Sequence, residues 1–527
     1  MNFFKIMKKV TIHKLFLFGS LIVLMACGSE IKKEGKGVST QEKGKTEKLN
    51  ILLITADDLN KNSVGAFGSV VPNITPNIDK LASQGVRFEN GHVNVAVCQP
   101  SRGILATGKY SHNSGIEGFF HTKKEIPDIV TTLKTNGYYT GILGKVEHSS
   151  PKELTPWDFH LDMDDLGKGR NKERYYTEAK NIIQNAKQEG KPFYMMANSH
   201  DPHRPFAFTK REEKWMSEGN EILKPSRIYN ESEVAIPGFL PELPLVRKEV
   251  TQYFNSVRRL DDTVGKILDI LEEEGVADNT IVMFLSDNGM AFPFSKTNCY
   301  LQSTNTPWIV RWPGKVMPNT INKKDFISAI DFFPTVLEAA GLQITDGLDG
   351  TSFVPTLLGQ EQKGRDKVFT QFFETSAQKQ FPMRCIQDAK YGYIFNAWSD
   401  GETRFRNESQ SGYTYKAMVK AGKTNPEIAA RVKLFDKRKV EEFYDFENDP
   451  NALHNLIEDP KYNEIINKYR ADMELWMEKV NDPALVFFKV KDDKIEMASL
   501  LAVEQERIDK LRPRKRRKKL KNAVPNK

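Results

Sequence analysis

The segment Cys98-Gln99-Pro100-Ser101-Arg102 combines a nucleophile with a fixed cation at the predicted start of a helix. Pro100 suits the first turn of a helix, and Gly108 suits its end. Free N–H groups and the helix dipole at such a start favour an anion beside Cys98. Arg102 follows about one turn later and adds a forked cation. Two interpretations of Cys98 follow, a reactive group beside an oxyanion site or an ordinary buried thiol.

Pairs of oxygen-bearing side chains follow two apolar runs that have the composition of buried strands. Asp57 and Asp58 follow the first run, and Asp287 and Asn288 follow the second. Ligands of open α/β sheets bind at the carboxyl ends of strands, so the two pairs are expected to meet there. Either pair alone could be a turn or a helix cap. Together they predict an oxygen-only site for one Ca²⁺, or less favourably Mg²⁺, rather than Zn²⁺.

Basic and imidazole side chains also follow predicted strands. Lys145 and His148 come just after one strand, and His200 and His203 lie beside prolines after the next. Lys296 follows the Asp-Asn pair in the next loop. A surface lysine and a loop histidine would explain the first pair in isolation. The repeated position after strands favours a shared site for an anion.

These segments must be carried by strands that alternate with helices. Strands are predicted at 49–55, 86–88, 138–143, 193–197 and 280–286. Helices are predicted at 76–84, 126–136, 174–188, 246–275, 329–340 and 460–480. The alternation predicts an α/β fold, and the strand patterns of 366–490 predict a smaller C-terminal α+β subdomain. We expect the charged residues Arg258, Arg259, Asp261 and Asp262 to form a solvated, ion-paired face of the helix predicted at 246–275.

Composition describes a globular protein and excludes a nucleic-acid partner. The chain has 527 residues, with 39% hydrophobic and 28% charged residues. Its net charge of +8 is misleading, because residues 1–49 and 510–527 alone carry more positive charge than that. The remaining body is acidic, so no nucleic-acid surface follows from the charge. Cys299 and Cys385 are expected to be free thiols.

The first residues have the pattern of a targeting segment. Lysines precede the apolar run 15–25, which ends in Leu24-Met25-Ala26-Cys27 and resembles a bacterial lipobox. This predicts a lipid anchor on Cys27 and a cell-envelope lipoprotein, in the outer membrane or periplasm of a Gram-negative bacterium. Plain secretion after cleavage near Ala26 remains an alternative. Both interpretations place the protein outside the cytoplasm.

The chain is therefore divided by its sequence into five parts. They are a signal peptide (1–26), a flexible tether (27–48), a catalytic domain (49–365), a C-terminal subdomain (366–490) and a basic tail (491–527).

The Cys-x-Pro-Ser-Arg pattern, followed by Thr107-Gly108, resembles the signature of type I sulfatases in the alkaline phosphatase superfamily. The preceding Asp-Asp strand and the helix beginning Thr75-Pro76-Asn77 occur in the order that this family shows. The resemblance implies a large mixed β-sheet flanked by helices. It also implies that a formylglycine-generating enzyme or an anaerobic maturase oxidises Cys98 to Cα-formylglycine, whose hydrate attacks sulfur.

The resemblance also implies roles for the other residues. The metal ligands would be Asp57, Asp58, Cys98 after its modification, Asp287 and Asn288. Cations that neutralise the sulfuryl oxygens would be Arg102, Lys145, His148 and Lys296. His203 would assist the leaving atom, and His200 would support substrate binding. Phe381-Pro382-Met383-Arg384 and the residues near Lys296 resemble the heparan sulfamidase branch, which would bring Arg384 into the substrate pocket.

We therefore expect an exported sulfatase that acts on a sulfated polysaccharide or its oligosaccharides. A heparan-type N-sulfate and an ulvan-type O-sulfate both remain open as substrates. A phosphodiesterase or phosphonate hydrolase of the same superfamily is one alternative. A non-catalytic glycan-binding lipoprotein with an unmodified Cys98 is another.

Overall fold

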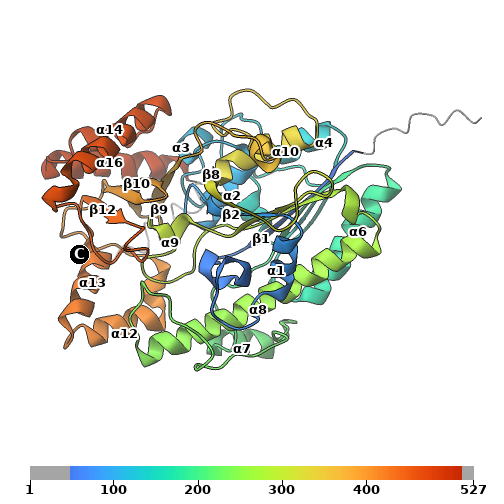
Figure 1. Cartoon of the computed structure of the whole chain (residues 1–527), viewed down its shortest axis with the longest axis horizontal. Coiled ribbons are helices and arrows are strands. Elements are labelled where there is room, and N and C mark those ends of the chain that lie inside the picture. Colours follow the sequence, from blue (N-terminus) through green and yellow to red (C-terminus); the bar gives the residue numbers. More distant parts are fainter. Residues whose placement is uncertain (1–47, 513–527) are drawn as a thin grey trace, which may run out of the picture. The chain divides into compact units, whose positions relative to one another are not determined.

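The computed structural model describes residues 48–512 (Figure 1). The predicted signal peptide, Cys27, the tether up to residue 47 and the tail from residue 513 lie outside the described residues. None of the helices in 48–512 is long and apolar enough to cross a membrane.

The larger sheet has eight strands in the order β4-β3-β5-β1-β6-β7-β2-β8. They are β1 (Asn50–Ala56), β2 (Val86–His92), β3 (Tyr139–Leu143), β4 (Phe159–Leu161), β5 (Phe193–Asn198), β6 (Thr280–Ser286), β7 (Trp308–Arg311) and β8 (Thr320–Ser328). Strand β7 runs antiparallel to both of its neighbours, whereas the remaining pairs are parallel. The predicted large mixed sheet is confirmed.

The central strands explain where the site must lie. Every residue of β1, β5 and β6 is buried, as expected for parallel strands covered on both faces. Because β4, β3, β5, β1 and β6 are mutually parallel, their carboxyl ends lie along one edge. The loops that carry the candidate residues leave the sheet at that edge.

Helices cover both faces of this sheet (Figure 1). One side carries α1 (Pro76–Ser83), α6 (Lys172–Gln188) and α8 (Pro244–Glu273), and the other carries α2 (Cys98–Thr107), α4 (Ile129–Thr135) and α10 (Phe332–Ala339). Shorter helices lie in the connections: α3 (Ser111–Ser114), α5 (Val146–Ser149), α7 (Lys210–Ser217), α9 (Leu301–Thr304) and α11 (Val354–Leu357).

The expected ion pairing on α8 is confirmed, since Arg258 pairs with Asp262, but the expected solvation is wrong for Arg259 and Asp261. Arg259 is buried and pairs with Asp201 and Glu212. Asp261 is also buried and accepts hydrogen bonds from the backbone N–H groups of Asn77 and its neighbour at the start of α1. Asp261 thus caps the start of α1, and Arg259 joins α8 to two neighbouring segments. Both charged groups therefore have hydrogen-bond partners although they are buried.

The smaller sheet is antiparallel, in the order β12-β11-β10-β9. Its strands are β9 (Lys367–Glu374), β10 (Gln380–Asp388), β11 (Tyr391–Asn396) and β12 (Glu441–Asp445). The accompanying helices are α12 (Tyr413–Ala421), α13 (Pro426–Lys437), α14 (Asn463–Lys479), α15 (Leu485–Lys489) and α16 (Lys494–Leu511). The smaller α+β part is confirmed, but α16 is a helix where the sequence predicted the start of a tail. Cys299 and Cys385 are free, as expected.

Candidate active site

Four oxygen-bearing side chains form the floor of the site, at the carboxyl ends of β1 and β6. Asp57, Asp58, Asp287 and Asn288 have no exposed surface. The backbone N–H of Asp58 donates to Asp287 Oδ1 at 3.2 Å, and Asn288 Nδ2 donates to Asp58 Oδ1 at 2.7 Å. The two predicted pairs, which are far apart in the sequence, therefore meet.

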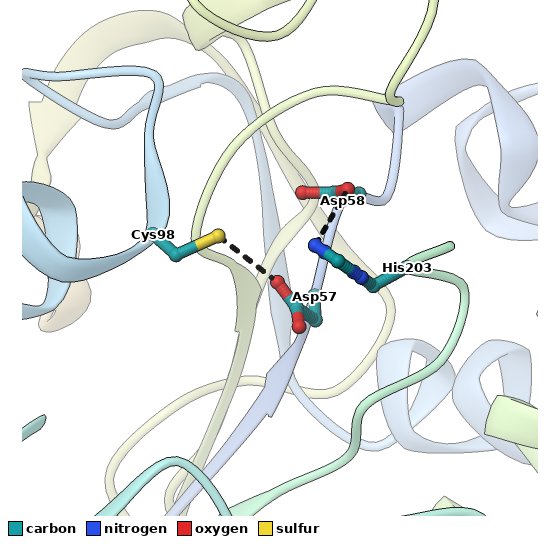
Figure 2. Close-up of side chains that lie close together, drawn as sticks. All are labelled: Asp57, Asp58, Cys98 and His203. Carbon is teal, nitrogen blue, oxygen red and sulfur yellow. Dashed lines mark hydrogen bonds and ion pairs between the residues drawn. The ribbon is translucent and has the colours of Figure 1, made fainter. Parts of the chain in front are cut away.

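Cys98 begins helix α2 and points at this floor. Its Sγ lies 3.4 Å from Asp57 Oδ1, as Figure 2 shows. Burial and the charge of Asp57 hold the pKa of the Cys98 thiol well above its usual range. The unmodified side chain is therefore a neutral thiol, a poor nucleophile as it stands.

Two lysines neutralise the carboxylates from either side. Lys145 forms an ion pair with Asp57, and Lys296 Nζ lies 2.8 Å from Asp58 Oδ1. Both side chains are buried, and burial lowers their pKa values, but the neighbouring carboxylates outweigh it and raise them. Both therefore remain charged.

Arg102 is buried against the carboxylate of Asp287 and is not among the residues that line the cavity. Its Nε and Nη2 lie 3.0 and 2.8 Å from Asp287 Oδ2, and Nη1 donates to Thr55 Oγ1 and Asn198 Oδ1. The side chain has no exposed surface. Arg102 therefore holds Asp287 in place, and its expected contact with sulfuryl oxygens stays a prediction.

Three histidines approach the same floor. His203 Nε2 lies 3.8 Å from Asp58 Oδ2 (Figure 2). Its Nδ1 donates to the carbonyl of Arg204 at 2.6 Å. Burial and the charge of Lys296 lower the pKa of His203 to about 4. The pKa values of His148 and His200 are also held well below the usual range, first by burial and then by Lys145.

A cavity of about 560 Å³ opens beside these groups. Lys145, His148, His200 and His203 are among its lining residues, together with Glu408 from the C-terminal half. The volume falls within the usual range for small-molecule sites.

Arg384 does not reach this cavity, so its predicted role in substrate binding is wrong. It is buried on β10, where Nε and Nη2 both donate to the carboxylate of Asp482. Its guanidinium also lies over the ring of Phe373, 4.4 Å from the centroid. Arg384 therefore belongs to a buried ion pair that stabilises the smaller sheet.

The floor fits a divalent cation. Ligand atoms of Asp57, Asp58, Cys98 and His203 lie within 4.8 Å of one another. Asn288 Oδ1 is buried and has no hydrogen-bond partner among the described residues. Burial raises the pKa of Asp58 to about 7 and that of Asp287 to about 6, a penalty that a cation would relieve. All-oxygen donors at Asp57, Asp58, Asp287 and Asn288 suit Ca²⁺ or Mg²⁺.

The sequence did not reveal three contributors to the site. Asn198, which accepts a hydrogen bond from Arg102, is the last residue of the buried strand β5, a position close to the one that revealed Asp57 after β1. Arg204 and Glu408 carry no such signal, because their contacts arise only in the folded chain.

The fold and this site describe a hydrolase for anionic esters, with a nucleophile position, a cation site and lysines around one cavity. The sulfatase family model matches residues 49–342, more than half of the chain, so the chain belongs to the sulfatase family. It is therefore a sulfuric ester hydrolase. The model for the C-terminal part of N-sulphoglucosamine sulphohydrolase matches residues 290–408.

Individual relatives agree with this assignment. The chain is 27% identical to the N-sulphoglucosamine sulphohydrolase of Homo sapiens, over 82% of this chain and 91% of that protein. It is also 27% identical to an ulvan-active sulfatase of Formosa agariphila, over 87% of this chain and 86% of that protein. A solved structure from a study of glycosaminoglycan metabolism by Bacteroides thetaiotaomicron has a TM-score of 0.64 at 20% identity, over 85% of this chain and 99% of that chain. That likeness supports the alkaline-phosphatase-like fold.

Proposed function

We propose that this chain is an exported sulfatase that releases sulfate from a sulfated glycan, with formylglycine at position 98 and one Ca²⁺ on the site floor. The single observation that carries the proposal is the placement of Cys98. It begins α2 with its Sγ 3.4 Å from a buried carboxylate of the candidate cation site. Lys145 stands beside the same carboxylate.

The proposed groups supply two kinds of chemistry when present. Formylglycine, as a hydrate, would supply the nucleophile that the neutral thiol lacks. A cation held by Asp57, Asp58, Asp287 and Asn288 would supply Lewis-acid polarisation of the sulfate.

The chain's own residues would orient and neutralise the substrate. Lys145 and Lys296 place two fixed positive charges where negative charge grows on the sulfuryl oxygens. Arg102 holds Asp287, so that the floor keeps its geometry. We assign substrate contacts to His148 and His200, because both line the cavity.

His203 would carry the proton for the leaving atom. Its Nδ1 must donate to the Arg204 carbonyl, which can only accept, so the neutral ring has a free lone pair on Nε2. With a pKa of about 4, the resting ring is neutral. Nε2 would acquire its proton when an anion occupies the cavity and then pass it to the leaving oxygen or nitrogen.

The substrate class is inferred from the relatives. One is a sulphohydrolase of N-sulphoglucosamine and another is active on ulvan, so both an N-sulfate and an O-sulfate of a polysaccharide remain candidates. Export rests on the leader pattern alone, with Cys27 as the proposed lipid anchor. Maturation requires a formylglycine-generating enzyme or an anaerobic maturase.

Two measurements test the proposal. After coexpression with a maturase, mass analysis of the Cys98 peptide should show the aldehyde; a thiol alone would favour a non-catalytic glycan-binding protein. The converted protein should then release sulfate from a panel of heparan and ulvan oligosaccharides. Faster hydrolysis of phosphate diesters or phosphonates than of every sulfate would favour the alternative enzyme class.

A further inference from the structure

One carboxylate on the cavity wall has no role in the proposed chemistry. Glu408 begins a short 3₁₀ helix, η5 (Glu408–Ser411), in the C-terminal half of the chain. Its Oε1 accepts a hydrogen bond from Lys296 Nζ at 3.1 Å. Glu408 and Ser411 both line the cavity that contains His203. The acid therefore lies next to a cation that we assign to sulfate binding.

Contacts on both sides hold η5 in this position. Asn407 Nδ2 donates to Thr297 Oγ1, directly beside Lys296. On the other side, the carboxylate of Glu249 accepts from the backbone N–H groups of Tyr413 and Thr414, at 2.9 and 2.7 Å. Glu408 is therefore presented to the cavity by a fixed corner rather than by a free loop.

A carboxylate here is costly for a site that binds an anion. Like charges at close range repel, and a low-dielectric cavity strengthens the repulsion. Glu147, Asp162 and Asp164 also line the cavity, but Glu408 is the lining carboxylate that is hydrogen-bonded to Lys296. Its side chain is 26% exposed. Within residues 48–512 the hydrogen bond to this carboxylate is made to Oε1, which leaves Oε2 available as an acceptor. An acceptor of this kind fits a substrate that offers a donor.

We propose that Glu408 determines specificity by accepting a hydrogen bond from a hydroxyl or N–H group that the substrate carries next to its sulfated atom. This inference rests on the proposed sulfatase function and narrows its substrate class. Sulfated sugars with a free neighbouring hydroxyl or amide would be preferred. Sugars with a second sulfate at that neighbouring position would be rejected, because they would place an anion against the carboxylate.

The role could instead be limited to positioning Lys296. In that case the loss of Glu408 would impair every sulfate ester to the same degree. A contact with the substrate predicts a loss that depends on the neighbouring donor. The two roles are separated by comparing substrates within one variant.

The test uses two probes that differ in one hydroxyl group, trans-2-hydroxycyclohexyl sulfate and cyclohexyl sulfate. Sulfate release by the converted full chain gives kcat/KM for each probe in wild type, Glu408→Gln and Glu408→Ala. Glu147→Gln is the matched control, because Glu147 is an exposed carboxylate on the same cavity wall with no ion pair among the described residues. Thermal melts confirm that each variant is folded.

A hydrogen bond to a charged acceptor predicts that the preference for the hydroxylated probe falls about tenfold or more in Glu408→Ala. Glu408→Gln, which keeps a neutral acceptor, should lie between wild type and Glu408→Ala, and Glu147→Gln should match wild type. An unchanged preference in Glu408→Ala, with both rates lowered equally, would overturn the inference while leaving the sulfatase assignment intact. A converted wild-type chain that releases no sulfate from these probes or from sulfated oligosaccharides would instead contradict the proposed function.

Discussion

The pairing of Arg102 with Asp287 allows a quantitative test of how the site floor is held. The Arg102 side chain is fully buried, and two of its nitrogens lie within 3.0 Å of one Asp287 oxygen. Arg102→Met keeps much of the side-chain volume but leaves a buried carboxylate without its cation. Breaking a buried pair in this way costs about 3–5 kcal/mol. The lost hydrogen bonds from Arg102 to Thr55 and Asn198 add less to this cost. Thr55 Oγ1 also donates to Asn198 Oδ1, so both side chains keep a hydrogen-bond partner in the variant.

Denaturant unfolding in the presence of a chelator measures this free energy of unfolding. Arg102→Lys should lie between wild type and Arg102→Met, since it keeps the charge but not the forked contact. Arg87→Met is a suitable control, because Arg87 forms a partly exposed pair with Glu89 at 3.3 Å that should contribute less than about 1 kcal/mol. A loss below about 1 kcal/mol in Arg102→Met, with an unchanged denaturant slope, would refute the positioning role.

Three further predictions concern the cation, a catalytic lysine and the pH dependence. Ca²⁺ at about a hundredfold excess over its dissociation constant should raise the free energy of unfolding by about 2.7 kcal/mol. Calorimetry should show that Asp58→Asn loses most of this gain, whereas the distant surface variant Asp278→Asn keeps it. An equal gain in both variants would contradict the cation site. Lys296→Met should lower kcat/KM for sulfate release about a hundredfold or more, whereas the exposed Lys390→Met should not; full activity in Lys296→Met would exclude the assigned role. Burial raises the pKa of Glu117 to about 7, so the folded state holds this proton more tightly than the unfolded state. The resulting stabilisation is complete below the ordinary glutamate pKa and is lost as the pH rises through about 7. The free energy of unfolding of wild type minus that of Glu117→Gln should therefore decrease over roughly pH 5 to 8. A difference that does not change with pH would contradict this assignment.

Residues that directly follow buried strands could be placed from the sequence. Asp57, Asp58, Asp287 and Asn288 were predicted to meet because parallel strands end at one edge, and β1 and β6 are such a pair. Lys145 was predicted by the same argument and lies against Asp57. Whether a residue follows a strand depends only on its neighbours in the sequence, so it can be predicted from the sequence.

Residues whose environment depends on tertiary packing could not be placed in this way. Arg384 and Asp482 form their ion pair between β10 and a loop nearly one hundred residues away, so a basic residue near a familiar pattern was mistaken for a substrate contact. Arg259 was expected on a solvated, ion-paired helix face, yet it is buried and its partner is the distant Asp201. Glu408 reaches the cavity only because Asn407 and Glu249 fix its helix there.

The central claim is that position 98 supplies the nucleophile of a sulfatase, and one measurement tests it most directly. Sulfate released from heparan and ulvan oligosaccharides is quantified for the converted wild-type chain and for Cys98→Ala, produced with the same maturase. We predict release by the wild-type chain from at least one of these glycans and none above background from Cys98→Ala. Equal release by both proteins would contradict the account.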